Sequence, residues 1–142
     1  MEQQRRRIEY TPLTNVLRAP RNPKRHNAEL IANSISRFGV VESPAIDERT
    51  GRLVAGHGRL DDWVARKAAG ENPPDGIEAD PDTGDWLVPV QRGWASRSDA
   101  DAEAYLVISN SSSEKGGWDD ANLAQLLADL RDQDPGLLDL TG

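Results

Sequence analysis

The junction between a short apolar run and a helical pattern constrains the fold of this chain more than any other segment. Residues 53–55 are apolar, residues 56–59 read Gly-His-Gly-Arg, and apolar side chains recur at helical spacing through residues 60–69. Glycines let the backbone bend sharply, and the first turn of a helix points free N–H groups toward the bend. Arg59 adds a fixed positive fork. The segment predicts a strand-turn-helix unit whose turn either receives an anion or is simply a tight turn with a surface arginine.

Length and composition narrow the class of protein. The chain has 142 residues, which is enough for one domain with a single core. It has no cysteine and two histidines, so a disulfide framework, a thiolate metal site and a cysteine nucleophile are excluded. No apolar run approaches the roughly 20 residues that span a bilayer, and residues 5–7 are not followed by the apolar core of a signal peptide. We expect a cytoplasmic protein without a membrane partner.

Charge is distributed unevenly along the chain. Residues 1–25 hold seven Lys and Arg against two acids, whereas residues 71–142 hold four against sixteen. The acidic second half repels a polyanion, so extensive wrapping of nucleic acid is not expected. A local basic face near the N-terminus leaves DNA as a partner there, and a solvated basic arm without a partner is the alternative.

Hydrophobic periodicity predicts an α+β chain of short strands and helices. Acidic residues 71–85 lack periodicity and are interpreted as an insertion loop, and residues 111–117 as a flexible connection. The predicted elements are an edge strand at 7–10, a helix capped by Asn27 that ends at Phe38 and Gly39, hairpin strands at 45–47 and 52–55, a helix at 59–69 with Trp63 in the core, an edge or bulged strand at 86–90 containing Pro89, a helix from Ser98 to near Asn110, and a helix from Asp119 to Asp134.

The last predicted helix carries a leucine stripe, formed by Leu123, Leu126, Leu127 and Leu130. Such a stripe packs on its own domain or forms a homodimer through this C-terminal helix. Residues 137–142 begin another apolar pattern, which suggests that the natural chain continues.

The order of these motifs resembles one known superfamily. A basic Asn-Pro-Lys-Arg-His segment at 22–26, a helix ending in Arg-Phe-Gly, a hairpin, the Gly-His-Gly-Arg turn and a late helix reaching Ser109-Asn110 occur in sequence. This order resembles the N-terminal nucleotide-binding domain of the ParB family, within the ParB/sulfiredoxin superfamily. It is most similar to the ParB-like nuclease domains of phage and mobile elements. The resemblance implies a small mixed sheet with helices packed around it.

The resemblance also implies a domain organisation and a ligand. It divides the chain into a basic arm at 1–7, a ParB-like nucleotide-binding domain at 8–132, and the start of a linker or truncated C-terminal region at 133–142. Family members bind a nucleotide, usually a triphosphate with Mg²⁺, and the nucleotides expected for this chain are CTP and ATP. By position, the implied phosphate-binding residues are Lys24, Arg25, Gly56, His57, Gly58, Arg59 and Asn110, and Asn110 is also the implied metal ligand.

Two residues are catalytic candidates. His57 could donate a hydrogen bond to phosphate or carry a proton near neutral pH, and its alternative is a solvent-exposed turn residue. Glu42, together with Asp61 and Asp62, lies close to the turn in sequence and could serve a nuclease.

The sequence departs from the family pattern at two points. Ser109 stands where partitioning proteins carry a metal-binding acid, which places Mg²⁺ dependence in doubt. Ala55 stands where kinases of the superfamily carry an acid, and the absence of cysteine excludes sulfiredoxin chemistry.

Three functions remain open at this point. The first is a nucleotide-binding domain that works as an NTPase switch in DNA processing or partitioning. The second is a ParB-like nuclease or DNA-modification component that grips a nucleic-acid phosphate. The third is a protein-interaction or dimerisation module in which the turn no longer binds a ligand.

Overall fold

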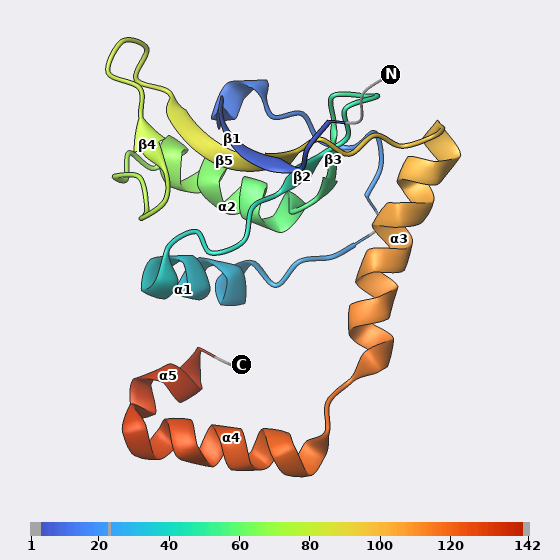
Figure 1. The fold of residues 1–142 in the computed structure, drawn as a ribbon. Coiled ribbons are helices and arrows are strands. Elements are labelled where there is room, and N and C mark those ends of the chain that lie inside the picture. The colour runs from blue at the N-terminus through green and yellow to red at the C-terminus, as the bar shows by residue number, and fades with distance from the viewer. Residues whose placement is uncertain (1–3, 23, 141–142) are drawn as a thin grey trace.

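A computed structural model describes residues 4–22 and 24–140, leaving the side chains of residues 110–115 outside the description. It is an α+β fold in which a small mixed sheet packs against α1 and α2, and three further helices extend from the end of the sheet (Figure 1). The elements are β1 (Arg7–Pro12), η1 (Leu13–Asn15), α1 (Ala28–Phe38), β2 (Ala45–Ile46), β3 (Leu53–Ala55), α2 (His57–Ala68), β4 (Glu78–Ala79), β5 (Trp86–Arg92), α3 (Asp99–Gly116), α4 (Asp120–Gln133) and α5 (Pro135–Asp139).

The sheet is organised around β5. Its strand order is β1-β5-β2-β3, and β4 also pairs with β5. The β1/β5, β4/β5 and β2/β3 pairs are antiparallel, whereas β2 runs parallel to β5. The small mixed sheet that the resemblance implied is therefore confirmed. The edge strand and the hairpin that local patterns predicted are confirmed as well.

The position of β5 corrects one prediction, because Pro89 suggested an edge or a bulge and instead lies in the central strand. Gln91 N donates to Pro44 O at 2.7 Å, so the N atom of Pro89, two residues earlier, lies on the same side of β5. On that side β5 pairs with β4 at residues 86–87 and with β2 at residue 91. Pro89 thus lies between the residues of β5 that pair with β4 and the residue that pairs with β2, where no N–H group is needed.

The core lies between the sheet and the two helices α1 and α2. Trp63 and Leu60 of α2 are buried against Val88 and Val90 of β5, and α1 contributes Ile35. Trp63 is fully buried, as predicted. At the start of α1 the Asn27 side chain accepts a hydrogen bond from Leu30 N at 3.0 Å, the cap that the sequence predicted.

The segment predicted as an acidic loop is partly ordered by the sheet. It contains β4, which is too short to show periodicity, and Ile77 is buried beside it. At its end Asp85 accepts hydrogen bonds from Lys67 Nζ at 2.6 Å and from Thr14 Oγ1 at 2.8 Å. Burial works to raise the pKa of Asp85, but these bonds outweigh it and lower the pKa to about 2. The loop is therefore anchored at one end by a charged contact to α2.

The C-terminal helices differ from expectation in length. The structure continues α3 through Gly116, so the predicted flexible connection at 111–117 is largely helical. The α4 helix begins at its Asp119 cap as predicted, but none of its residues is buried. Figure 1 shows α4 and α5 below α1, away from the sheet. Across the residues that the structure describes, none of the helices has both the length and the apolar character to cross a membrane.

Candidate functional site

The strand-to-helix turn begins with a glycine that a larger residue could not replace. Gly56 caps α2 in the left-handed region at φ +92°, directly after β3. A Cβ atom at this position would lie 2.6 Å from Pro44 Cβ. Both backbone conformation and packing therefore require glycine here.

At the second glycine, packing favours the absence of a side chain. A Cβ atom on Gly58 would lie 2.7 Å from Ile31 Cδ1 and 2.9 Å from His26 Nδ1. The sequence predicted that the glycines allow close approach to a ligand, whereas the structure brings α1 and the preceding segment to that surface. Gly58 thus brings His26 to the first turn of α2, a neighbour that the sequence did not assign to the site.

His57 fixes the basic segment to the start of α2. The imidazole is buried, and its Nε2 accepts a hydrogen bond from Ala19 N at 3.0 Å. The neutral ring therefore carries its proton on Nδ1. Burial lowers the pKa of His57, and the neighbouring His26 and Arg18 lower it further, against an opposing effect of Asp61. Because Nε2 already accepts from Ala19, a phosphate-binding or proton-carrying role would fall to Nδ1. The alternative of a solvent-exposed turn residue is wrong, since His57 is buried.

We expect this histidine to make stability depend on pH near neutrality. Because the pKa of His57 is lowered by folding, the unfolded chain takes up a proton first as pH falls below about 6.5, and the native state loses stability. Urea unfolding from pH 7 to 5.5 should show this loss in the parent protein. His57→Gln, which keeps a side-chain acceptor, should flatten the slope; an unchanged slope would exclude His57 as its source.

Arg59, in the first turn of α2, pairs with Glu42. Arg59 Nη2 lies 2.8 Å from Glu42 Oε2, and the two side chains are 39% and 74% exposed. The structure thus brings two predicted site residues together, but as partners of each other. A solvent-exposed pair of this kind contributes about 0–1 kcal/mol, so an anion competes with Glu42 at little cost.

Of the remaining predicted site residues, Lys24 and Arg25 belong to the segment that precedes α1, and Asn110 belongs to α3. Lys24 is half-buried, with its backbone N–H donating to Asn22 Oδ1 at 3.2 Å, and Arg25 is exposed. Asn110 belongs to α3, but its side chain lies outside the described residues. The candidate metal ligand is therefore not described.

The acids next to the turn are engaged by arginines. Asp61 pairs with Arg18, and Asp62 with Arg66 at 2.7 Å. In the part of the chain that the structure describes, no three His, Asp or Glu side chains converge in a manner that could hold a metal ion.

A cavity that the sequence did not predict lies beside the basic segment. It has a volume of about 370 Å³ and an apolar floor formed by β3 and α3, including Leu53 and Leu106. Arg21 crosses its rim to Glu103 of α3, with Nη2 to Oε2 at 2.6 Å. Contacts between a loop and a helix so distant in sequence leave no local signal in the chain.

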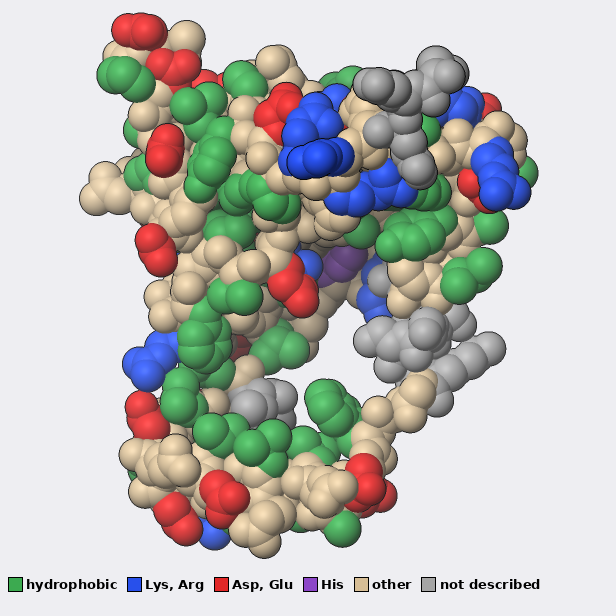
Figure 2. All heavy atoms as spheres, in the orientation of Figure 1, with side chains coloured by type: hydrophobic (Ala, Val, Ile, Leu, Met, Phe, Trp, Pro, Cys, Tyr) green, Lys and Arg blue, Asp and Glu red, His purple; other side chains and the backbone are tan. Residues whose placement is uncertain are grey.

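The charged residues that line this cavity are two arginines and two acids, Arg21, Arg52, Asp99 and Glu103. Figure 2 shows histidine and Lys or Arg side chains where the surface is hollowed between the sheet and the C-terminal helices. A comparison of the chain with protein-family models and with curated proteins finds no match.

Proposed function

We propose that the first turn of α2 and the basic segment at 18–25 bind the phosphates of a nucleotide. The observation that carries the proposal is the contact between the basic segment and the N-terminal end of α2. Ala19 N donates to His57 Nε2 at 3.0 Å, and His26 lies against Gly58. The N-terminal end of a helix and nearby cations both favour an anion.

The ligand assigned is a nucleoside triphosphate, and the supporting argument is the resemblance of the motif order to the ParB family. Arg59 would exchange Glu42 for a phosphate oxygen, and Lys24 would add a second cationic contact. The chain would then act as a nucleotide-dependent switch, with hydrolysis as its reset. Mg²⁺ fits such a ligand through the phosphate oxygens and water.

Calorimetric titration with CTP, ATP and GTP, with and without Mg²⁺, tests the proposal. Arg59→Ala should weaken binding roughly ten- to a hundredfold, because a charge-assisted hydrogen bond to phosphate is lost. Glu42→Gln should tighten it severalfold, because a competing carboxylate is neutralised. Arg131→Ala, which removes an exposed arginine of α4, is the matched control and should bind like the parent.

Opposite effects at Arg59 and Glu42 distinguish a phosphate contact from a general loss of folding. The absence of heat with all three nucleotides would refute the proposal, as would an Arg59→Ala variant with the parent's affinity. Phosphate release measured on the same samples then decides whether hydrolysis follows binding.

A further inference from the structure

The first strand leaves one edge of the sheet open. Among residues 4–22 and 24–140, β1 pairs with β5 alone, in a continuous register from Arg7 opposite Arg92 to Pro12 opposite Leu87. An edge strand presents a row of N–H and C=O groups that can pair with another chain. The question is which groups face outward and what they fit.

The N–H and C=O groups of β1 point alternately toward β5 and toward the open edge, and the register determines which residues point each way. Gln91 N donates to Pro44 O at 2.7 Å, so the polar groups of Gln91 are turned toward β2 and away from β1. Ile8 lies opposite Gln91 and is therefore part of a pair without hydrogen bonds between these two strands. The N–H and C=O groups of Ile8 and Tyr10 consequently point to the outer edge, whereas those of Arg7 and Glu9 point to β5.

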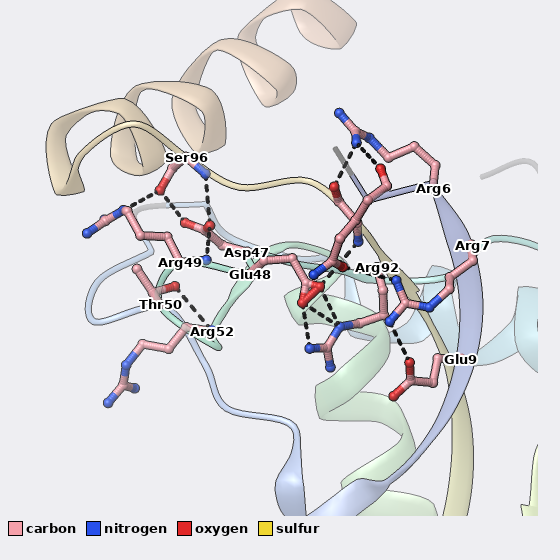
Figure 3. Close-up of polar contacts among 12 residues, drawn as sticks. Arg6, Arg7, Glu9, Asp47, Glu48, Arg49, Thr50, Arg52, Arg92 and Ser96 are labelled. Carbon is pink, nitrogen blue, oxygen red and sulfur yellow. Dashed lines mark hydrogen bonds and ion pairs between the residues drawn. The ribbon is translucent and has the colours of Figure 1, made fainter. Parts of the chain in front are cut away.

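The side chains of the strand also separate into two sets. Ile8 and Tyr10 lie on one face and are 55% and 47% exposed, high values for large apolar residues. Arg7 and Glu9 lie on the other face, where Arg7 Nη2 and Glu9 Oε2 are 2.9 Å apart (Figure 3). The neighbouring Arg92–Glu48 pair on this face, 2.6 Å apart, adds no net charge.

We propose that β1 pairs antiparallel with β1 of a second copy, with Ile8 opposite Ile8, so that two sheets join across a two-fold axis. In this register the outward N–H and C=O groups of Ile8 bond to their counterparts in the partner copy. Arg7 lies opposite Glu9 of the second copy, twice, in positions where paired side chains approach most closely. The two ion pairs within the strands, one in each copy, are thus replaced by two ion pairs between the strands.

Charge complementarity selects this register over its neighbours. In an antiparallel pair, the side chains of two directly opposite residues lie on the same face of the sheet. With a two-fold axis perpendicular to the sheet, this holds only when the axis passes beside a residue that lies opposite its own copy. Placing the axis at Arg7 opposes two arginines, and placing it at Glu9 opposes two glutamates. The axis at Ile8 opposes apolar side chains and pairs every charge of Arg7 and Glu9 with its opposite.

Sedimentation equilibrium tests the proposal through charge exchange. The parent should form a dimer of 15.6 kDa chains. Glu9→Arg and Arg7→Glu should each weaken the dimer on the order of tenfold or more, because both inter-strand pairs become repulsive. An equimolar mixture of these two variants should associate, since an all-basic strand then meets an all-acidic strand, and the double variant should dimerise again.

Three further variants complete the experiment. Ile8→Pro removes an outward N–H without removing a bond to β5 and should abolish the dimer, with circular dichroism to confirm folding. Arg131→Glu changes charge on α4 and should leave the dimer intact. A monomeric parent at millimolar concentration, a mixture that fails to associate, or a dimer that is lost with Leu126→Asp but kept with Glu9→Arg would overturn the proposal.

Discussion

Replacing Trp63 with alanine should cost about 3–5 kcal/mol of the free energy of unfolding. The side chain is fully buried between α2 and the sheet, so truncation removes apolar contacts on every side and leaves a cavity. Small domains are stable by about 5–15 kcal/mol, and this single change would remove a large part of that margin. Urea unfolding followed by circular dichroism measures it.

A milder substitution at the same position separates packing from hydrogen bonding. Trp63 Nε1 is buried and finds no hydrogen-bond partner among the described residues. Trp63→Phe removes this unpaired donor along with part of the ring, and its cost should therefore be much smaller than that of alanine. Trp118→Ala, at a position 77% exposed, should change stability by less than about 0.5 kcal/mol. Equal effects at Trp63 and Trp118 would contradict the location of the core.

Replacing Asp47 with asparagine should lower the free energy of unfolding by about 3 kcal/mol. The carboxylate is completely buried, and both of its oxygens accept hydrogen bonds. Ser96 N and Oγ lie 2.9 Å and 2.5 Å from its oxygens, and Arg49 N lies at 3.0 Å (Figure 3). Both backbone N–H groups bond to Oδ1, so an amide nitrogen would face the Ser96 hydroxyl. That hydroxyl already accepts from Arg49 Nε at 2.8 Å and would lose the acceptor of its own proton. These contacts join the β2–β3 turn to the segment that leads into α3.

The matched control for Asp47 is a neighbouring acid on the same network. Arg49 Nη2 lies 2.6 Å from Asp99, whose side chain is 88% exposed. Asp99→Asn should cost less than about 1 kcal/mol, since water replaces the lost contact. A similar cost for Asp47→Asn would mean that the buried network contributes little.

The same network predicts a response to acid. Burial tends to raise the pKa of Asp47, but the hydrogen bonds from Ser96 and Arg49 prevail and lower it below 3.8. Its contribution to stability is therefore present above the unfolded pKa and is lost as pH falls through the lower folded pKa. Asp47→Asn should reduce the loss of stability measured by urea unfolding below pH 4.

Local patterns predicted the elements whose signals are contained in a few residues. Asn27 and Asp119 cap helices because a short polar side chain before an apolar stripe satisfies free N–H groups, and no distant contact is needed. The strand-turn-helix unit at Gly56 follows from the same local chemistry. It begins two residues earlier than predicted, because His57 and Gly58 already belong to the first helical turn.

Structural features that depend on partners distant in sequence could not be predicted. Pro89 resembles an edge residue in sequence, and only the separate pairing of β4 and β2 with β5 makes its central position tolerable. In sequence Asp47 is typical of an ordinary turn residue, and its place in a buried network depends on the fold bringing Ser96 next to it. The bond from Ala19 to His57 and the pair of Arg59 with Glu42 likewise depend on where the chain returns in space.

The sequence by itself determined the order of the strands and helices other than η1, β4 and α5, together with the caps, the core tryptophan and the basic segment, because capping and periodicity act within one or two turns of chain. Tertiary structure alone decided how the sheet is ordered, which carboxylates are buried, and which atoms of the turn are already engaged. Those properties arise from pairing and burial between segments tens of residues apart, and no pattern of neighbouring residues encodes them.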